Sequence, residues 1–117
     1  MLSEPACDLA HAFLELIAMI RHVVLLAFKD EATAERRAEL AAAFAGLASR
    51  IAQVRSLEWG LDVSPEGLAK GFTHCFVVTF GCEADRDAYL PHPAHQAFVD
   101  ALKPWLADVL VIDYAQP

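Results

Sequence analysis

The sequence predicts an α+β domain in which a four-stranded antiparallel sheet carries helices on one face. The elements follow the order strand, helix, strand, strand, helix, strand, which is the βαββαβ order of the ferredoxin-like plan. The 117 residues suffice for one domain and leave little room for a second. Hydrophobic residues make up 56% of the chain and charged residues 21%, which favours a packed core over disorder.

The first strand and the first long helix are expected between residues 20 and 52. Ile20–Phe28 is rich in β-branched and large apolar residues, and it ends at the polar turn 29–31. Thr33 is of a residue type that caps helices. Apolar residues then recur at helical spacing through Ala52, namely Leu40, Phe44, Leu47 and Ile51.

Two further strands are expected in the middle of the chain. Residues 54–61 predict one strand, which ends before the turn-forming segment 62–65. Residues 72–80 (FTHCFVVTF) carry the strongest strand signal in the chain. A short helix is expected after Cys82, and Pro91 ends it because proline cannot continue a helix.

The last helix and strand follow at once. His92 is expected to cap this helix, with Pro93 at the first helical position, where proline is well tolerated. The apolar stripe of the helix consists of Phe98, Leu102 and Trp105. Pro104 kinks or ends the helix, and the final strand is expected over residues 107–114.

The first 19 residues are expected to form an appendage outside the domain, which occupies residues 20–117. Their apolar residues at helical spacing favour a short helix; these are Phe13, Leu14, Ile17 and Ala18. Acidic residues interrupt the segment, and it lacks the basic start of a signal peptide. No run approaches the ~20 apolar residues of a membrane span. We therefore expect a cytoplasmic protein with no membrane partner.

The charge balance argues against a nucleic-acid partner. Lys and Arg total 9 against 16 Asp and Glu, so the formal net charge is -7. Such a surface repels phosphate backbones, and the chain has no basic stripe to attract them. No nucleic-acid partner is therefore expected.

The predicted sheet is apolar on both faces. An antiparallel sheet with one face in water alternates apolar and polar residues, but the first strand places apolar residues on each side. One face would carry Val24, Leu26 and Phe28, and the other Val23, Leu25 and Ala27. Helices can cover only one face, and such a patch is rarely left exposed on a monomer. We therefore expect a homodimer in which two sheets pack face to face.

Five short motifs occur in order along the chain: 21–24 (RHVV), 59–60 (WG), 71–74 (GFTH), 89–95 (YLPHPAH) and 112–114 (IDY). In these motifs the chain resembles the stress-responsive A/B barrel (Dabb) family, and the HPxH segment after a tyrosine is the most specific piece. The resemblance implies a dimeric α/β barrel, made of two ferredoxin-like protomers.

The resemblance also implies an activity. A plant enzyme of this family closes a linear polyketide into an aromatic acid without a metal or an organic cofactor. Its acid/base pair is the tyrosine and the second histidine of the segment that matches Tyr89 and His95, and a pocket-lining histidine matches His22. The resemblance thus implies a cofactor-independent, lyase-like cyclase or isomerase that binds a small oxo acid, polyketide or aromatic compound.

Chemistry alone points to the same pair. The His95 imidazole can take a proton near neutral pH, and the Tyr89 phenol can donate a hydrogen bond to a substrate carbonyl. The alternative is that His95 bonds backbone in the first turn of its helix while Tyr89 packs beneath that helix. The protein would then be a non-catalytic homodimer with a stress-related or small-ligand-binding role.

Two other histidines are candidate substrate-binding residues. His22 and His74 each begin a strand and could line one cleft; alternatively, backbone or a partner subunit satisfies them at the strand ends. No metal site is expected, because the histidines lack HExxH spacing and the cysteines lack CxxC spacing.

Overall fold

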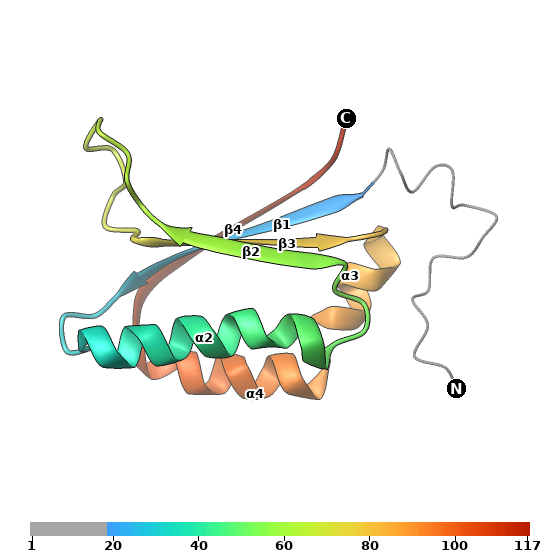
Figure 1. Cartoon of the computed structure of the whole chain (residues 1–117), viewed down its shortest axis with the longest axis horizontal. Helices are drawn as coiled ribbons and strands as arrows, with labels where there is room; N and C mark the ends of the chain where they lie inside the picture. The colour runs from blue at the N-terminus through green and yellow to red at the C-terminus, as the bar shows by residue number, and fades with distance from the viewer. Residues whose placement is uncertain (1–18) are drawn as a thin grey trace.

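The computed structural model describes residues 19–117 (Figure 1). Its elements, in chain order, are β1 (Ile20–Phe28), α2 (Ala34–Arg50), β2 (Ser56–Leu61), β3 (His74–Phe80), α3 (Glu83–Tyr89), α4 (Pro93–Leu102), the short 3-10 helix η2 (Lys103–Trp105) and β4 (Leu106–Ala115). The expected helix within residues 1–19 lies outside the described residues, apart from Met19. No helix in the described range is long and apolar enough to cross a bilayer.

The strands form one antiparallel sheet in the order β2-β3-β1-β4. β1 is central, because it pairs with β3 on one side and with β4 on the other. Helices α2 and α4 lie side by side on one face of the sheet, and α3 follows β3 at one end of it (Figure 1). The ferredoxin-like α+β prediction is therefore confirmed.

Both predicted helix caps are present. The Thr33 hydroxyl accepts a hydrogen bond of 3.0 Å from the backbone N–H of Arg36 at the start of α2. The His92 ring accepts one of 3.0 Å from the backbone N–H of Ala94, with Pro93 opening α4. These bonds satisfy N–H groups that the first turn of a helix leaves without partners.

Strand boundaries differ from the predictions by one or two residues. The strand expected over residues 54–61 begins at Ser56, and the one expected over 107–114 is Leu106–Ala115. The strand expected from residue 72 begins at His74. The chain is still turning just before it, since Lys70 and Gly71 have φ of 58° and 89°. The backbone N–H of Phe72 also bonds back to the Ala69 carbonyl at 3.0 Å. The left-handed backbone of this turn costs glycine little, which explains Gly71 at that position.

The core lies between the sheet and the two long helices. Phe44 of α2 stacks on Phe76 of β3, with ring centroids 4.0 Å apart, and Phe98 of α4 completes the group at 4.9 Å from Phe44. Aromatic rings bury large apolar areas, so they contribute much of the core's stability. The interior face of β1 and β3 is thereby covered.

The opposite face of the sheet is also apolar. Val23, Leu25 and Val77 are only half-buried there, and on β4 the side chains of Leu110 and Ile112 are 41% and 56% exposed. β1 and β3 thus carry apolar side chains on both faces of the sheet, as the sequence predicts. The described chain leaves this second apolar face uncovered.

A matched pair of valines tests the position of the core. Val78 of β3 is fully buried, whereas Val63 in the loop after β2 is 92% exposed. Val78→Ala removes two methyl groups and leaves a cavity, so the free energy of unfolding should fall by about 2 kcal/mol. Val63→Ala should change it by no more than about 0.5 kcal/mol. Urea unfolding measures both; equal effects would contradict the described core.

Candidate functional site

Three elements bring the side chains of His22, Tyr89 and His95 together. Tyr89, the last residue of α3, has its ring centroid 4.5 Å from that of His95 on α4 and 5.9 Å from that of His22 on β1. Phe80 of β3 closes the cluster, at 5.0 Å from Tyr89. Three of the four predicted site residues are therefore neighbours.

The turn between α3 and α4 sets this geometry. The backbone N–H of His92 bonds the Tyr89 carbonyl at 3.1 Å, which tightens the turn. The Leu90 carbonyl is then contacted by two side chains, the His95 ring at 2.9 Å and the Gln96 amide at 2.8 Å. The alternative expectation of a backbone bond for His95 is thus met, and that bond orients the ring against Tyr89.

Tyr89 carries a buried hydroxyl without a partner. Its side chain is fully buried, and its Oη has no hydrogen-bond partner among the described residues. A buried polar group left in this way costs about 1–3 kcal/mol. Burial also raises the pKa of Tyr89, because a low-dielectric surrounding disfavours the phenolate. At neutral pH the residue is therefore a protonated O–H donor.

His95 is a neutral imidazole at neutral pH. Burial lowers its pKa, and the nearby His22 and His92 add to this, while the bond to the Leu90 carbonyl acts in the opposite direction. A carbonyl only accepts, so Nδ1 carries the proton and donates it to Leu90. Nε2 then holds a lone pair. The pair thus combines a base with a hydrogen-bond donor.

His22 is held by a carboxylate on the neighbouring strand. Its Nδ1 lies 2.7 Å from Oδ1 of Asp113, which is its register partner on β4. The second carboxylate oxygen accepts a bond of 3.1 Å from the guanidinium of Arg86 on α3. The sequence prediction missed Arg86 and this role of Asp113. The available signal was a carboxylate flanked by apolar residues near the end of the last strand.

His74 does not join this cluster. It pairs with Leu26, four residues along β1 from His22, so the two histidines lie about 13 Å apart. Its ring meets that of Phe28 edge to face, with centroids 5.0 Å apart, and its Nδ1 lies 2.8 Å from Thr73 Oγ1. β1 and β3 run antiparallel, so the starts of the two strands fall at opposite ends of the sheet. One cleft cannot contain both residues.

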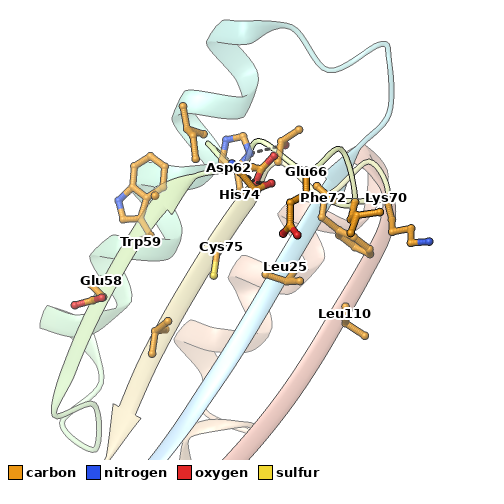
Figure 2. A pocket seen from close by; sticks show the side chains of 17 residues that line it. Leu25, Glu58, Trp59, Asp62, Glu66, Lys70, Phe72, His74, Cys75 and Leu110 are labelled. Atoms are coloured by element: carbon orange, nitrogen blue, oxygen red, sulfur yellow. Dashed lines mark hydrogen bonds between the residues drawn. The ribbon is translucent and has the colours of Figure 1, made fainter.

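A hollow of about 640 Å³ lies near His74 instead. It is bounded by the loop joining β2 and β3 and by the sheet face that the helices leave uncovered. Figure 2 shows Leu25, Cys75 and Leu110 on that face and Lys70 on the loop. The hollow therefore belongs to the uncovered apolar face and not to the Tyr89 cluster. Within residues 19–117, no group of three or more His, Cys, Asp or Glu side chains could hold a metal ion.

Residues 20–116 match the family model described as Stress responsive A/B Barrel Domain. The stress-response A/B barrel domain-containing protein HS1 of Arabidopsis thaliana is 40% identical over 95 residues, which are 81% of this chain and 87% of that protein. Olivetolic acid cyclase of Cannabis sativa is 32% identical over 95 residues, which are 81% of this chain and 94% of the cyclase.

Solved structures agree in fold. The crystal structure of At3g17210 from Arabidopsis thaliana matches with a TM-score of 0.79 and 40% identity, over 84% of this chain and 94% of that one. A dimeric ferredoxin-like protein of unknown function from Thermobifida fusca matches with a TM-score of 0.71 and 28% identity, over 84% and 91% of the two chains.

The lowered pKa of His95 predicts how stability depends on pH. The native ring binds a proton less readily than the unfolded ring, whose pKa is near 6.5, so the unfolded state holds more protons just below that value. Stability should therefore fall as the pH drops below about 6.5. In urea unfolding between about pH 5 and 7.5, His95→Gln should show a shallower fall than the wild type.

The fall should not vanish in this variant, because burial also lowers the pKa of His74. An equal slope in wild type and His95→Gln would contradict a half-buried His95 that is neutral in the native state.

Proposed function

Since the chain belongs to the stress-responsive A/B barrel domain family, we propose that it is a cofactor-independent acid/base enzyme, a cyclase or isomerase in type. The observation that carries this proposal is the buried Tyr89 hydroxyl, which has no partner within residues 19–117 and lies beside a neutral His95. Olivetolic acid cyclase is among the relatives that match most of the chain. Its name supports a related chemistry on a small oxo acid, polyketide or aromatic compound.

In the proposed reaction His95 is the base. Its Nε2 takes a proton from a carbon next to a substrate carbonyl, and the electron pair of the broken C–H bond moves toward the carbonyl oxygen. The Tyr89 O–H donates a hydrogen bond to that oxygen and stabilises the enolate. In a cyclase, the enolate carbon then attacks a second carbonyl of the same molecule, which forms the C–C bond of the ring and restores the first carbonyl. The oxygen of the second carbonyl takes the proton from His95 and becomes a hydroxyl. In an isomerase, His95 instead returns the proton to the far carbon of a double bond conjugated with the enolate, and the first carbonyl is again restored.

The surroundings of the pair suit this step. Phe80 and the ring of His22 border Tyr89, so few other dipoles compete for the hydrogen bond. Electrostatic interactions are stronger in such a low-dielectric site than in water. His22 is proposed as a third, substrate-contacting group, whereas His74 at the other end of the sheet has no part in this step.

A second candidate function is a non-catalytic homodimer that serves a stress-related or ligand-binding role. The close contact of the Tyr89 and His95 rings and the full burial of Tyr89 favour this candidate, because both also fit a packing role. A test must therefore separate loss of chemistry from loss of packing.

Tyr89→Phe makes that separation. It removes only the hydroxyl, which has no partner in the described part of the chain, so the melting temperature should stay the same or rise. The rate at which the protein exchanges α-protons of β-keto acids for deuterium should fall by about 10²-fold or more, as should that of His95→Ala. Nuclear magnetic resonance of the substrate in D₂O measures the rate.

The control is Tyr114→Phe, since Tyr114 is the chain's other tyrosine and lies on β4, half exposed. It should keep the wild-type rate. Unchanged rates in both Tyr89→Phe and His95→Ala, or no exchange by the wild type with any β-keto acid, would exclude the enzyme and favour the non-catalytic dimer.

We also propose that two protomers pack through the sheet face that the helices leave uncovered. Support comes from the exposed apolar side chains of Leu110 and Ile112 and from the dimeric Thermobifida fusca structure. In such a dimer the hollow near His74 lies against the partner's sheet. Covering this face removes apolar surface from water, which drives association.

Adjacent residues of β4 test the dimer. Leu110 faces the uncovered side and Val109 the helix side, with similar exposures of 41% and 46%. Leu110→Lys should convert the protein to a species near the protomer mass of 12.8 kDa, because it would place a charge in the interface. Val109→Lys should stay at twice that mass. Light scattering decides, and a wild type at 12.8 kDa would refute the interface.

We also propose the domain boundaries and the cellular location of the protein. The family match over residues 20–116 supports a domain at 20–117 that is preceded by an appendage at 1–19. A cytoplasmic location fits the described residues, which hold no membrane-spanning helix, and remains a prediction.

A further inference from the structure

Asp113 links two side chains from different elements. One carboxylate oxygen lies 2.7 Å from Nδ1 of His22, and the other lies 3.1 Å from a guanidinium nitrogen of Arg86. His22 is almost fully buried, while Asp113 and Arg86 are about one-fifth exposed at the side chain. Each oxygen is therefore used by a different partner.

The fold brings the three groups together by register and by helical spacing. His22 and Asp113 are cross-strand partners in the β1–β4 pair, so their side chains share a face. Arg86 precedes Tyr89 by three residues on α3, and residues at that spacing lie on one side of a helix. The turn of α3 that places Tyr89 in the cluster thus also places Arg86 at Asp113.

This arrangement determines which nitrogen of His22 carries a proton. An ionised carboxylate only accepts, so the nitrogen facing Asp113 must donate. When the ring is neutral, Nε2 then holds the lone pair. Arg86 holds the second oxygen of Asp113, so the first oxygen stays directed at Nδ1 of His22. Both effects favour a proton on Nδ1 of His22.

Asp113 needs Arg86 to hold this geometry. It lies on β4, an edge strand of the sheet, and its side chain has access to water. A carboxylate with one buried partner could turn toward solvent, whereas a second charge-assisted bond restrains its plane. Arg86 is itself restrained by Asp87 at 3.0 Å and Glu83 at 3.5 Å.

We propose that Arg86 is a positioning residue, which acts through Asp113 to hold His22 as the neutral tautomer with Nδ1 protonated. The Nε2 lone pair of His22 is thereby kept available as an acceptor beside Tyr89 and His95. The purpose of this arrangement rests on the proposed acid/base function, but the tautomer itself can be measured in the absence of any substrate.

The test is ¹⁵N nuclear magnetic resonance of the histidine rings near neutral pH. In the wild type, His22 should show a protonated Nδ1, an unprotonated Nε2 and a slowly exchanging Nδ1 proton. Arg86→Met should give a mixture of tautomers or a doubly protonated ring, with exchange of that proton at least about tenfold faster, as expected when a charge-assisted hydrogen bond is weakened.

Two variants control this experiment. Asp87→Asn removes another carboxylate partner of Arg86 without touching Asp113, so it should leave the His22 spectrum unchanged. Arg86→Lys keeps the charge and should restore the wild-type tautomer. If Arg86→Met does not give a dispersed spectrum, Arg86→Gln, which also removes the charge, takes its place.

A wild-type His22 with its proton on Nε2 would overturn the inference. So would an Arg86→Met or Arg86→Gln variant in which His22 keeps both its wild-type tautomer and the wild-type exchange rate of its Nδ1 proton. Neither result depends on catalysis. Failure of the Tyr89 and His95 variants to affect turnover would refute the proposed function and leave the tautomer result standing.

Discussion

The pairing of β1 with both β3 and β4 determines where the polar groups of this protein lie. His22 faces the helices because of its position in β1, and the register with β4 sets Asp113 directly opposite. On β3 the residue opposite His22 is Val78, which is apolar. Of the two cross-strand neighbours of His22, Asp113 is therefore the polar one. A shift of one residue would turn His22 to the other face of the sheet.

The buried polar groups of this small core differ in whether they have hydrogen-bond partners among the described residues. Nδ1 of His22 is bonded to Asp113, and Asp113 to Arg86, so this part of the cluster costs little stability. Tyr89 is the opposite case, since its hydroxyl is buried and no described residue bonds to it. A protein that needed Tyr89 only for packing would gain stability from phenylalanine there. The retained hydroxyl therefore fits a group that contacts something other than the described chain.

Local signals in the sequence were sufficient for the elements and for part of the site. Thr33 and His92 cap helices as predicted, because a cap depends only on residues in the next turn. Tyr89 and His95 are separated by one tight turn, so their contact could be expected from the 89–95 segment. The start of β3 was misplaced by two residues, since the backbone of the preceding turn depends on φ values at Lys70 and Gly71.

Contacts between distant segments could not be predicted in the same way. The bond from His22 to Asp113 spans the whole domain, and nothing near either residue specifies the register that joins them. Of the two alternatives for His22 and His74, the shared cleft is ruled out for a related reason, because antiparallel pairing places the starts of β1 and β3 at opposite ends of the sheet. Nothing in the local sequence of α3 indicates that Arg86 bonds Asp113 on β4, 27 residues away along the chain.

The most direct test of an acid/base site at Tyr89 is a crystal structure with a bound enolate analogue of a β-keto acid. The account predicts the analogue's oxygen within about 2.6–3.2 Å of Tyr89 Oη, and His95 Nε2 facing the carbon that would lose its proton. An analogue bound instead in the hollow near His74, with the Tyr89 hydroxyl still unpartnered, would contradict it.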